Sequence, residues 1–351
     1  MSALHSLAEG EAAVARYVDW ARTQSDVLVR VLTDVDCRAE FLDAGLMNYV
    51  WRLHAGSAVY FLKQARTRIR HHDRVGPDLA SVSPNRITAE ARALAFVQNR
   101  LPHLSGERIP RLTWHDTLNN VLWTEALGEE SRSLQGELET GSFCTESAGW
   151  VGELLGTLHS ADRGEVSHIW PSWTEDRQNW ERFLRMRTVG VLQGAQLPRA
   201  VEEMIRNLHA DGEAAAISGM LSHLDLAPKN VLLHPDRAPS VLDFELGAAC
   251  SDPAYDPGFL MGHYVLMGIN RDDSPAVAWV AAQRVLQTYL STAGPQDPHF
   301  RSRAWQYAGM VLLYRIHGSS PAPYVRRDRL EAIHAAGIRL VMEAEPWGAV
   351  V

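Results

Sequence analysis

The sequence predicts an α+β fold in which a lobe built on an antiparallel β-sheet precedes a mainly helical C-terminal lobe. Short β-rich runs flank one helical segment in the first 124 residues, and helical periodicity dominates from Thr145 onward. The one strand signal in the second half is a short hairpin. The chain of 351 residues is long enough for two domains, which we place at 1–127 and 128–351.

The N-terminal elements follow from apolar spacing and turn residues. Valine, alanine and leucine recur at i+3 and i+4 before the first β-rich run, as in an amphipathic helix. Pro84 marks the start of a second helix. The expected elements are helix 10–32, strands 40–53 and 58–64, helix 84–97, and strands 110–114 and 120–124.

The C-terminal half predicts a helical lobe interrupted by a hairpin. Val151, Leu154, Leu155 and Leu158 have the spacing of one helix face. Pro235-Asp-Arg-Ala-Pro239 is a turn between two β-rich segments. The expected elements are helices 145–159 and 176–186, a helix from about 198, the hairpin 230–243, and helices 254–269, 276–292, 301–316 and 327–343.

Composition is that of a globular enzyme, with 46% apolar and 22% charged residues. The net charge is −8; residues 1–128 hold 15 basic and 14 acidic residues (+1), so the remainder holds 19 and 28 (−9). This balance argues against a nucleic-acid partner. The acidic second half indicates either a cationic substrate or surface solubility. Three dispersed cysteines, and no signal peptide or membrane helix, favour the cytoplasm and no membrane partner; the oligomeric state stays open.

One motif carries most of the functional information. The run from His223 to Asn230 reads H-x-D-x-x-x-x-N, and Val241–Glu245 supplies D-F-E after a short hairpin. This is the catalytic-loop and metal-loop spacing of kinase-like phosphotransferases. Asp225 would orient, and could deprotonate, an acceptor hydroxyl. Asn230 and Asp243 would bind Mg²⁺, because magnesium prefers oxygen ligands.

Lysine usage adds weight to two positions. The chain has only two lysines, Lys63 and Lys229, and its other 32 basic residues are arginine. A lysine retained in so arginine-rich a sequence is expected where a compact point charge is needed. Lys229 lies within the motif, where it could stabilise the charge of the transferred phosphoryl group, and Lys63 lies in a predicted strand.

Further segments resemble the aminoglycoside phosphotransferase and methylthioribose kinase group, the small-molecule branch of the protein-kinase-like fold. His223–Asn230 is similar to its H-G-D-x-x-P-x-N, and Ser251–Phe259 resembles its G-D-P-x-x-D-L-A-x. Leu46–Leu53 is similar to an N-x-V-x-R-V phosphate-loop strand, and Tyr314–Tyr324 to a late R-x-D-G-x-S-P-x-x-Y segment. These matches run from about residue 41 to 324. The resemblance implies a bilobal phosphotransferase that uses Mg²⁺ and ATP or GTP.

The resemblance also implies roles for nucleotide-binding residues. Lys63 falls where the lysine of the α- and β-phosphates belongs, and Glu90 falls at its ion-pair partner. Gly45 and Asn48 fall in the phosphate loop. The residues expected to meet the adenine through backbone groups are Thr124, Glu125 and Leu127.

The departures from the family pattern narrow the substrate class. Leu224 replaces the family glycine after the histidine, and the phosphate loop lacks G-x-G-x-x-G. Only eight residues separate Asp243 from Asp252, which leaves no room for an activation loop and argues against a protein substrate.

The acceptor itself stays open. A sugar-containing antibiotic of aminoglycoside or nucleoside type is the favoured acceptor, and phosphorylation would then confer resistance. The alternatives are a metabolic kinase of methylthioribose, choline or homoserine type, and a catalytically inactive binding module. The side chains that could line the acceptor site are Trp170, Trp173, Trp180, His263, Tyr264, Arg315 and His317.

Overall fold

The computed structural model divides the chain into two compact units, Met1–Glu129 and Glu130–Val351. Each unit has its own set of buried apolar side chains. The structure describes residues 6–33, 35–43, 47–71, 83–128, 131–161, 173–271, 275–319 and 321–345, with the backbone alone for 9, 173–176 and 275.

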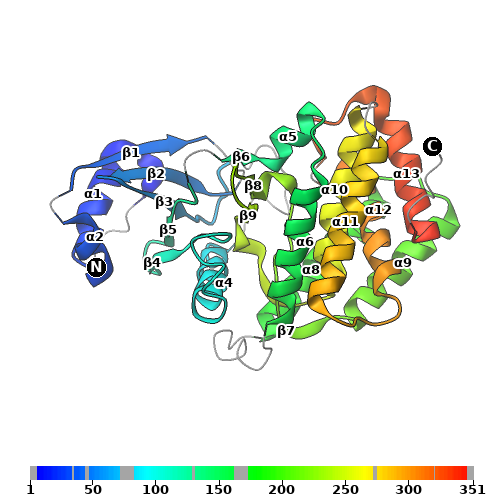
Figure 1. The fold of residues 1–351 in the computed structure, drawn as a ribbon, viewed down its shortest axis with the longest axis horizontal. Helices are drawn as coiled ribbons and strands as arrows, with labels where there is room; N and C mark the ends of the chain where they lie inside the picture. Colours follow the sequence, from blue (N-terminus) through cyan, green and yellow to red (C-terminus); the bar gives the residue numbers. More distant parts are fainter. Residues whose placement is uncertain are drawn as a thin grey trace. The chain divides into compact units, whose positions relative to one another are not determined.

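The first unit is built on a five-stranded antiparallel sheet in the order β1-β2-β3-β5-β4 (Figure 1). Four strands were predicted, and five are present because the run 40–53 contains the end of β1 and most of β2. β3 lies at the centre of the sheet. The strands are β1 (Cys37–Leu42), β2 (Tyr49–Ala55), β3 (Ala58–Gln64), β4 (Leu112–Asp116) and β5 (Val121–Glu125).

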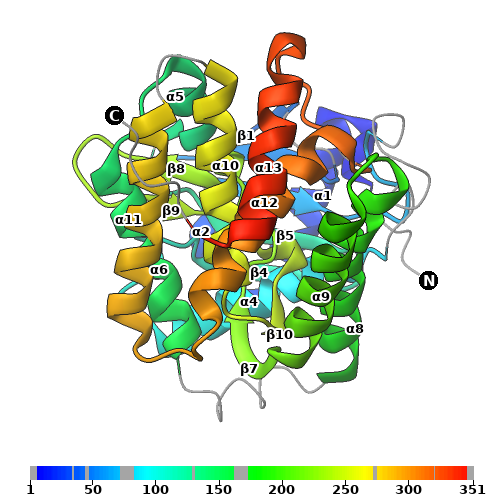
Figure 2. The same ribbon diagram turned by 90° about the vertical axis from the view of Figure 1, so that its right-hand side faces the viewer.

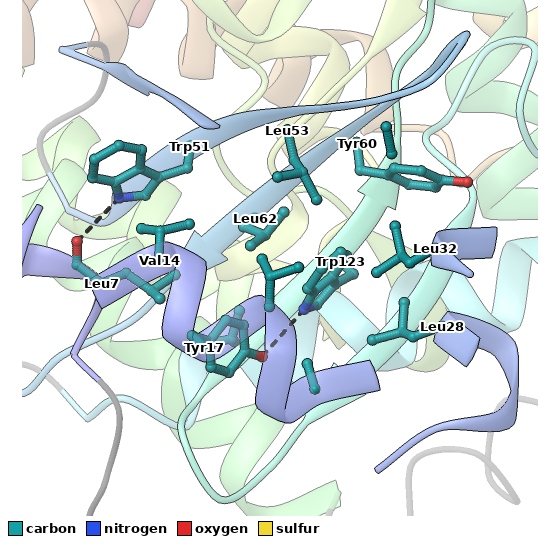
Figure 3. Packing of buried hydrophobic residues seen from close by; sticks show 14 residues of the cluster. Leu7, Val14, Tyr17, Leu28, Leu32, Trp51, Leu53, Tyr60, Leu62 and Trp123 are labelled. Atoms are coloured by element: carbon teal, nitrogen blue, oxygen red, sulfur yellow. Dashed lines mark hydrogen bonds between the residues drawn. The ribbon is translucent and has the colours of Figure 1, made fainter. Parts of the chain in front are cut away.

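Two helices, α1 (Glu11–Arg22) and α2 (Asp26–Leu32), pack their apolar side chains against the sheet. Figure 3 shows this core, in which the Tyr17 hydroxyl accepts a hydrogen bond from Trp123 Nε1 (3.1 Å). The prediction of one continuous helix here was wrong. The chain turns at Thr23, whose hydroxyl and N–H both bond back to the end of α1.

The opposite sheet face carries Lys63, because side chains alternate between faces along a strand. Leu62 belongs to the core beneath α1 and α2, so its neighbour Lys63 projects the other way. Helix α4 (Arg86–Arg100) meets Lys63 there through Glu90. The alternation of β3 thus brings Lys63 and Glu90, 27 positions apart in sequence, together.

The second unit is mainly helical, and its longest helices pack side by side (Figures 1 and 2). α6 packs against α11, and α10 packs against both α11 and α12. In the part of the chain that is described, no helix combines the length and apolarity needed to cross a membrane. The helices are α5 (Leu134–Thr140), α6 (Thr145–Ser160), α8 (Trp173–Arg187), α9 (Arg199–Ala214), α10 (Tyr255–Arg271), α11 (Pro275–Ala293), α12 (Phe300–His317) and α13 (Leu330–Glu343).

The predicted hairpin is present, and three strands were missed. β8 pairs antiparallel with β9, and Val231 faces Val241. β7 and β10 pair antiparallel and are almost wholly buried, so they lack the polar alternation by which strands are recognised in a sequence. The strands of this unit are β6 (Arg132–Ser133), β7 (Ile217–Ser222), β8 (Val231–Leu233), β9 (Ser240–Val241) and β10 (Ala248–Ser251).

Candidate functional site

The loop His223–Ala227 leaves the end of β7 and is held in place by one buried carboxylate. Asp256, at the start of α10, accepts hydrogen bonds from the backbone N–H of His223 (2.7 Å) and of Leu224 (2.9 Å). His159 Nε2 lies 3.2 Å from the same carboxylate. Burial raises the pKa of Asp256, but the hydrogen bonds from His159 and from the His223 backbone help to hold it below its usual value. Asp256 is therefore an ionised anchor for the loop.

Leu224 adopts a left-handed backbone conformation. Its φ is +62°, which is uncommon for a residue with a Cβ atom. The side chain is fully buried. Its N–H donates to Asp256 and its carbonyl accepts from Arg187 Nη1. Apolar burial and these two bonds offset the backbone strain, which explains how leucine is accepted at this position.

His223 ties this loop to the segment that carries Asp243. The Asp225 N–H donates to His223 Nδ1 (3.2 Å), so the ring proton lies on Nε2, which donates to the Leu242 carbonyl (2.8 Å). The imidazole also packs on Phe244, with ring centroids 4.6 Å apart. His223 thus fixes the spacing between the two halves of the motif.

Asp225 has a cation at each carboxylate oxygen. Arg187 Nη2 donates to Oδ1 (2.8 Å), and Lys229 Nζ lies 3.4 Å from Oδ2. Burial alone raises the pKa of Asp225, but Lys229, Arg187 and Arg315 together hold it well below its usual value. The side chain is 15% exposed. Asp225 is therefore an ionised hydrogen-bond acceptor and a weak base.

The hairpin brings Asn230 and Asp243 to the same end. Val231 pairs with Val241, and the Leu242 N–H donates to the Asn230 carbonyl (2.8 Å), which leaves Asp243 as the next residue. Asn230 Nδ2 donates to the Asp225 carbonyl (2.9 Å), so the amide oxygen points away from that bond. Asp243 has φ +70°, a conformation that aspartate tolerates better than most residues.

These donors suit Mg²⁺. Asn230 and Asp243 offer an amide oxygen and a carboxylate, the ligand types that hard cations prefer. Among the residues described, no group of three or more His, Cys, Asp or Glu side chains is arranged to hold a metal ion. Magnesium bound here would complete its coordination with nucleotide phosphates and water, as is usual for this ion.

In the first unit, Lys63 Nζ lies 2.7 Å from Glu90 Oε2, and the two side chains are 15% and 7% exposed. A mostly buried lysine held by a carboxylate is the arrangement predicted for the phosphate-binding lysine. Asn48 is buried, and its Oδ1 accepts from Arg86 Nη2 (2.8 Å), so it braces its loop against α4. Gly45 lies outside the described residues.

The predicted adenine-binding residues lie at the end of β5. Thr124 pairs with Phe61 and Glu125 with Tyr60, so both are anchored to the central strand. The Glu125 N–H already donates to the Arg111 carbonyl (3.0 Å). Leu127 is buried just beyond the strand.

The acceptor candidates are not all gathered at Asp225. Trp180 is fully buried and meets Tyr255 edge-on, so its ring belongs to the core. His317 pairs with His334 (2.8 Å). Tyr264 is also fully buried. Trp170 and the side chain of Trp173 lie outside the described residues.

His263 and Arg315 do lie together. Arg315 Nη2 is 3.5 Å from His263 Nε2, and burial together with Arg315 lowers the pKa of His263 well below its usual value. The positive charge of Arg315 helps to lower the pKa of Asp225. The negative charge of Asp225 opposes the lowering of the His263 pKa but does not overcome it. His263 is thus a neutral, buried histidine in the neighbourhood of Asp225.

Three residues that hold the loop of Asp225 in place were not identified from the sequence. Asp256 lies inside the segment 251–259 that resembles the family pattern, so its position was visible although its role was not. Arg187 and His159 gave no signal, because a single arginine or histidine on a predicted helix looks like any surface residue.

Comparisons with known proteins identify the family and the fold. Residues 38–295 match the profile of a family described as "Phosphotransferase enzyme family". No curated protein sequence matches the chain. The solved structures that match include a type I macrolide 2'-phosphotransferase, with 14% identity, a TM-score of 0.53, and coverage of 92% of this chain and 96% of that one.

Two further structures have the same fold. Choline kinase LicA from Streptococcus pneumoniae gives 12% identity, a TM-score of 0.51, and coverage of 94% and 99%. Aminoglycoside phosphotransferase APH(2'')-Ib with ADP bound gives 12% identity, a TM-score of 0.50, and coverage of 94% and 98%. Similarity at these identities establishes the fold, and it confirms the predicted kinase-like fold class.

Proposed function

Because the chain belongs to the phosphotransferase enzyme family, we propose that it moves the γ-phosphoryl group of ATP or GTP to a hydroxyl group of a small molecule. The observation that carries the proposal is the assembled loop His223–Asn230. In that loop Asp225 is ionised and hydrogen-bonded, and Asn230 is paired across the hairpin with the strand leading to Asp243. Phosphoryl transfer depends chiefly on such positioning and on charge stabilisation.

The second unit would perform the chemistry. Asp225 accepts a hydrogen bond from the acceptor hydroxyl and orients its oxygen toward the γ-phosphorus. Lys229 is half-exposed on a flexible stem and can shift from Asp225 to the transferred phosphoryl group. Asn230 and Asp243 would hold Mg²⁺, which when bound neutralises charge on the nucleotide phosphates.

The first unit would bind the nucleotide. Lys63, held by Glu90, would contact the α- and β-phosphates. The backbone at Thr124, Glu125 and Leu127 would meet the purine, and the loop braced by Asn48 would cover the phosphates. The ion pair matters because it keeps a long, flexible lysine in one conformation before the nucleotide arrives.

The transfer itself is a single displacement. The acceptor oxygen forms a bond to the γ-phosphorus while the bond between that phosphorus and the β–γ bridging oxygen breaks, and its electron pair stays on the nucleoside diphosphate. The hydroxyl proton passes to solvent through a phosphoryl oxygen. Asp225 does not retain this proton, because the neighbouring cations hold its pKa well below its usual value.

For the acceptor we favour a sugar-containing antibiotic. Proteins of the same fold are phosphotransferases of macrolides and aminoglycosides. Only eight residues, which include η5 (Phe244–Leu246) and β10, link Asp243 to Asp252, and they leave no room for an activation loop. A choline kinase also shares the fold, so a metabolic alcohol is the alternative acceptor. The proposed use of ATP or GTP fits a protein that works in the cytoplasm, where nucleoside triphosphates are available.

A direct screen tests the proposal. The purified chain is incubated with Mg²⁺ and either ATP or GTP, together with macrolides, aminoglycosides, nucleoside antibiotics, methylthioribose, choline or homoserine. We expect one class to gain 80 Da by mass spectrometry, the mass of one added phosphoryl group, in a magnesium-dependent reaction. If no acceptor is modified and no nucleotide is bound, the chain is the inactive binding module named above as the alternative.

A further inference from the structure

We propose that Arg187 is a positioning residue for this phosphoryl transfer: its guanidinium holds Asp225 by one carboxylate oxygen and leaves the other to face the acceptor hydroxyl. The inference rests on the proposed function, because it assigns a task to a side chain that contacts the proposed catalytic carboxylate. No motif or periodic pattern in the sequence singles out Arg187.

Arg187 makes three contacts with its two terminal nitrogens. Nη2 donates to Asp225 Oδ1 (2.8 Å), while Nη1 donates to the Leu224 carbonyl and to the Tyr255 hydroxyl (2.5 Å). The guanidinium therefore bonds the backbone of the loop and the carboxylate that follows it. Because the same guanidinium is also bonded to the Leu224 carbonyl and the Tyr255 hydroxyl, its single bond to the carboxylate sets where Oδ1 lies relative to the loop.

Aromatic rings hold the guanidinium in place. Its central carbon lies 4.5 Å from the Phe259 ring centroid and 5.9 Å from that of Tyr255. Both rings are on α10. Trp180, which precedes Arg187 on α8, packs edge-on against Tyr255 with ring centroids 5.1 Å apart. Arg187 occupies the last turn of α8 and is buried. Cation–π contacts in a desolvated site stabilise the charge and restrict its motion.

The two cations on Asp225 are therefore not equivalent. The Arg187 side chain is 8% exposed and anchored by several groups, whereas Lys229 is 46% exposed and touches Asp225 at 3.4 Å. An approaching hydroxyl can displace Lys229 from Oδ2 at little cost, but it cannot displace Arg187 from Oδ1. The acceptor is consequently directed to Oδ2, and Lys229 is released toward the phosphoryl group.

The test compares Arg187→Met with Arg182→Met, which removes an exposed arginine from the same helix. The readout is turnover of magnesium ATP, with water as the acceptor and with the acceptors of the panel above. We expect Arg187→Met to lower kcat about 100-fold, as a small misplacement of a catalytic group does. The nucleotide KM should stay near the wild-type value. Arg182→Met should match wild type.

A second variant separates positioning from folding. Arg187→Ala leaves a space beside Phe259, and added guanidinium, at a concentration well below denaturing, should recover part of the lost kcat. Unchanged kcat in folded Arg187→Met, or a loss in Arg187→Ala that guanidinium does not relieve, would overturn the proposal. A wild-type protein that transfers phosphoryl to no acceptor, water included, would instead overturn the proposed function.

Discussion

Several buried or mostly buried charged side chains in the described part of the chain are paired with a side chain of opposite sign or with hydrogen-bond donors. Such groups are costly to bury alone, and removing one member leaves the other uncompensated. Each pair therefore identifies side chains whose positions the fold restrains. They are Lys63–Glu90, Arg187–Asp225, His159–Asp256 and Arg303–Asp252.

The nucleotide-binding role of Lys63 is testable without knowledge of the acceptor. Lys63→Met should weaken ATP binding about 10- to 100-fold, because it removes a charge-assisted contact worth about 1.5–3 kcal/mol. The measurement is calorimetric titration with magnesium ATP. Glu90→Gln should show a smaller loss, and Arg66→Met, which alters an exposed arginine after the same strand, should bind ATP like wild type. Equal affinities for all three variants would remove Lys63 from the nucleotide site.

Asp256 should matter to stability as much as to activity. Asp256→Ala leaves the N–H groups of His223 and Leu224 and the ring of His159 without their shared acceptor. We expect the free energy of unfolding to fall by about 3 kcal/mol. Urea denaturation at pH 7 measures this change. A loss within experimental error would mean that the loop is held by other contacts.

The pH dependence of this contribution follows from the lowered pKa of Asp256. An unfolded chain has an aspartate pKa of about 3.9, so the stabilisation is complete above about pH 5 and is lost as pH falls through the folded value. The difference in unfolding free energy between wild type and Asp256→Ala should therefore be constant from pH 6 to 8 and shrink in acid. A difference that grows on acidification would show that the carboxyl is protonated when folded.

At the scale of elements, the sequence predicts what has a repeating pattern and misses what does not. The core helices of the second unit were expected because their apolar residues recur at helical spacing. β7 and β10 were missed because both are buried over most of their length. The hairpin β8–β9 was found because Pro235 and Pro239 bound its turn and because the motif residues flank it.

Packing between α6 and α11 gives a prediction for one glycine. A Cβ atom added to Gly152 would clash with the backbone carbonyl of Val285, whereas one added to Gly149, on the same helix, would meet the side chain of Arg284 at 3.1 Å. Gly152→Ala should therefore cost about 1–3 kcal/mol of stability through overpacking. Gly149→Ala should be neutral or stabilising by about 1 kcal/mol, because alanine favours the helix. Thermal unfolding of the pair distinguishes the sites, and equal melting temperatures would contradict the predicted close contact.

At the scale of the whole molecule, the two units carry separate parts of the proposed machinery. The first holds Lys63 on a sheet whose other face is covered by α1 and α2, which precede the segment that matches the family. Tyr17 of α1 donates to Asp116 (3.1 Å) and accepts from Trp123. These helices therefore belong to the core of the first unit, although the family profile begins after them.

The motif residues could be proposed from the sequence because the motif consists of particular residue types at fixed, short separations along the chain. Asp243 is only 18 residues after Asp225, and Asn230 lies between them. Arg187 and Asp225 are 38 positions apart in the sequence. The contact between them depends on how α8 packs against α10. Long-range packing of this kind leaves no periodic trace in the sequence. Whether the candidate acceptor side chains lie near Asp225 depends on packing of the same kind, so their spacing along the chain could not select among them.

The central claim is that Asp225 orients a hydroxyl for phosphoryl transfer, and Asp225→Asn tests it most directly because the change removes the charge and keeps the shape. The measurement is the rate of magnesium-dependent phosphoryl transfer from ATP, with ATP affinity determined on the same preparation. We predict a rate at least about 1,000-fold below wild type with nucleotide binding retained, as expected when a group needed in the transition state is lost. An Asp225→Asn protein that transfers phosphoryl at the wild-type rate would contradict the account.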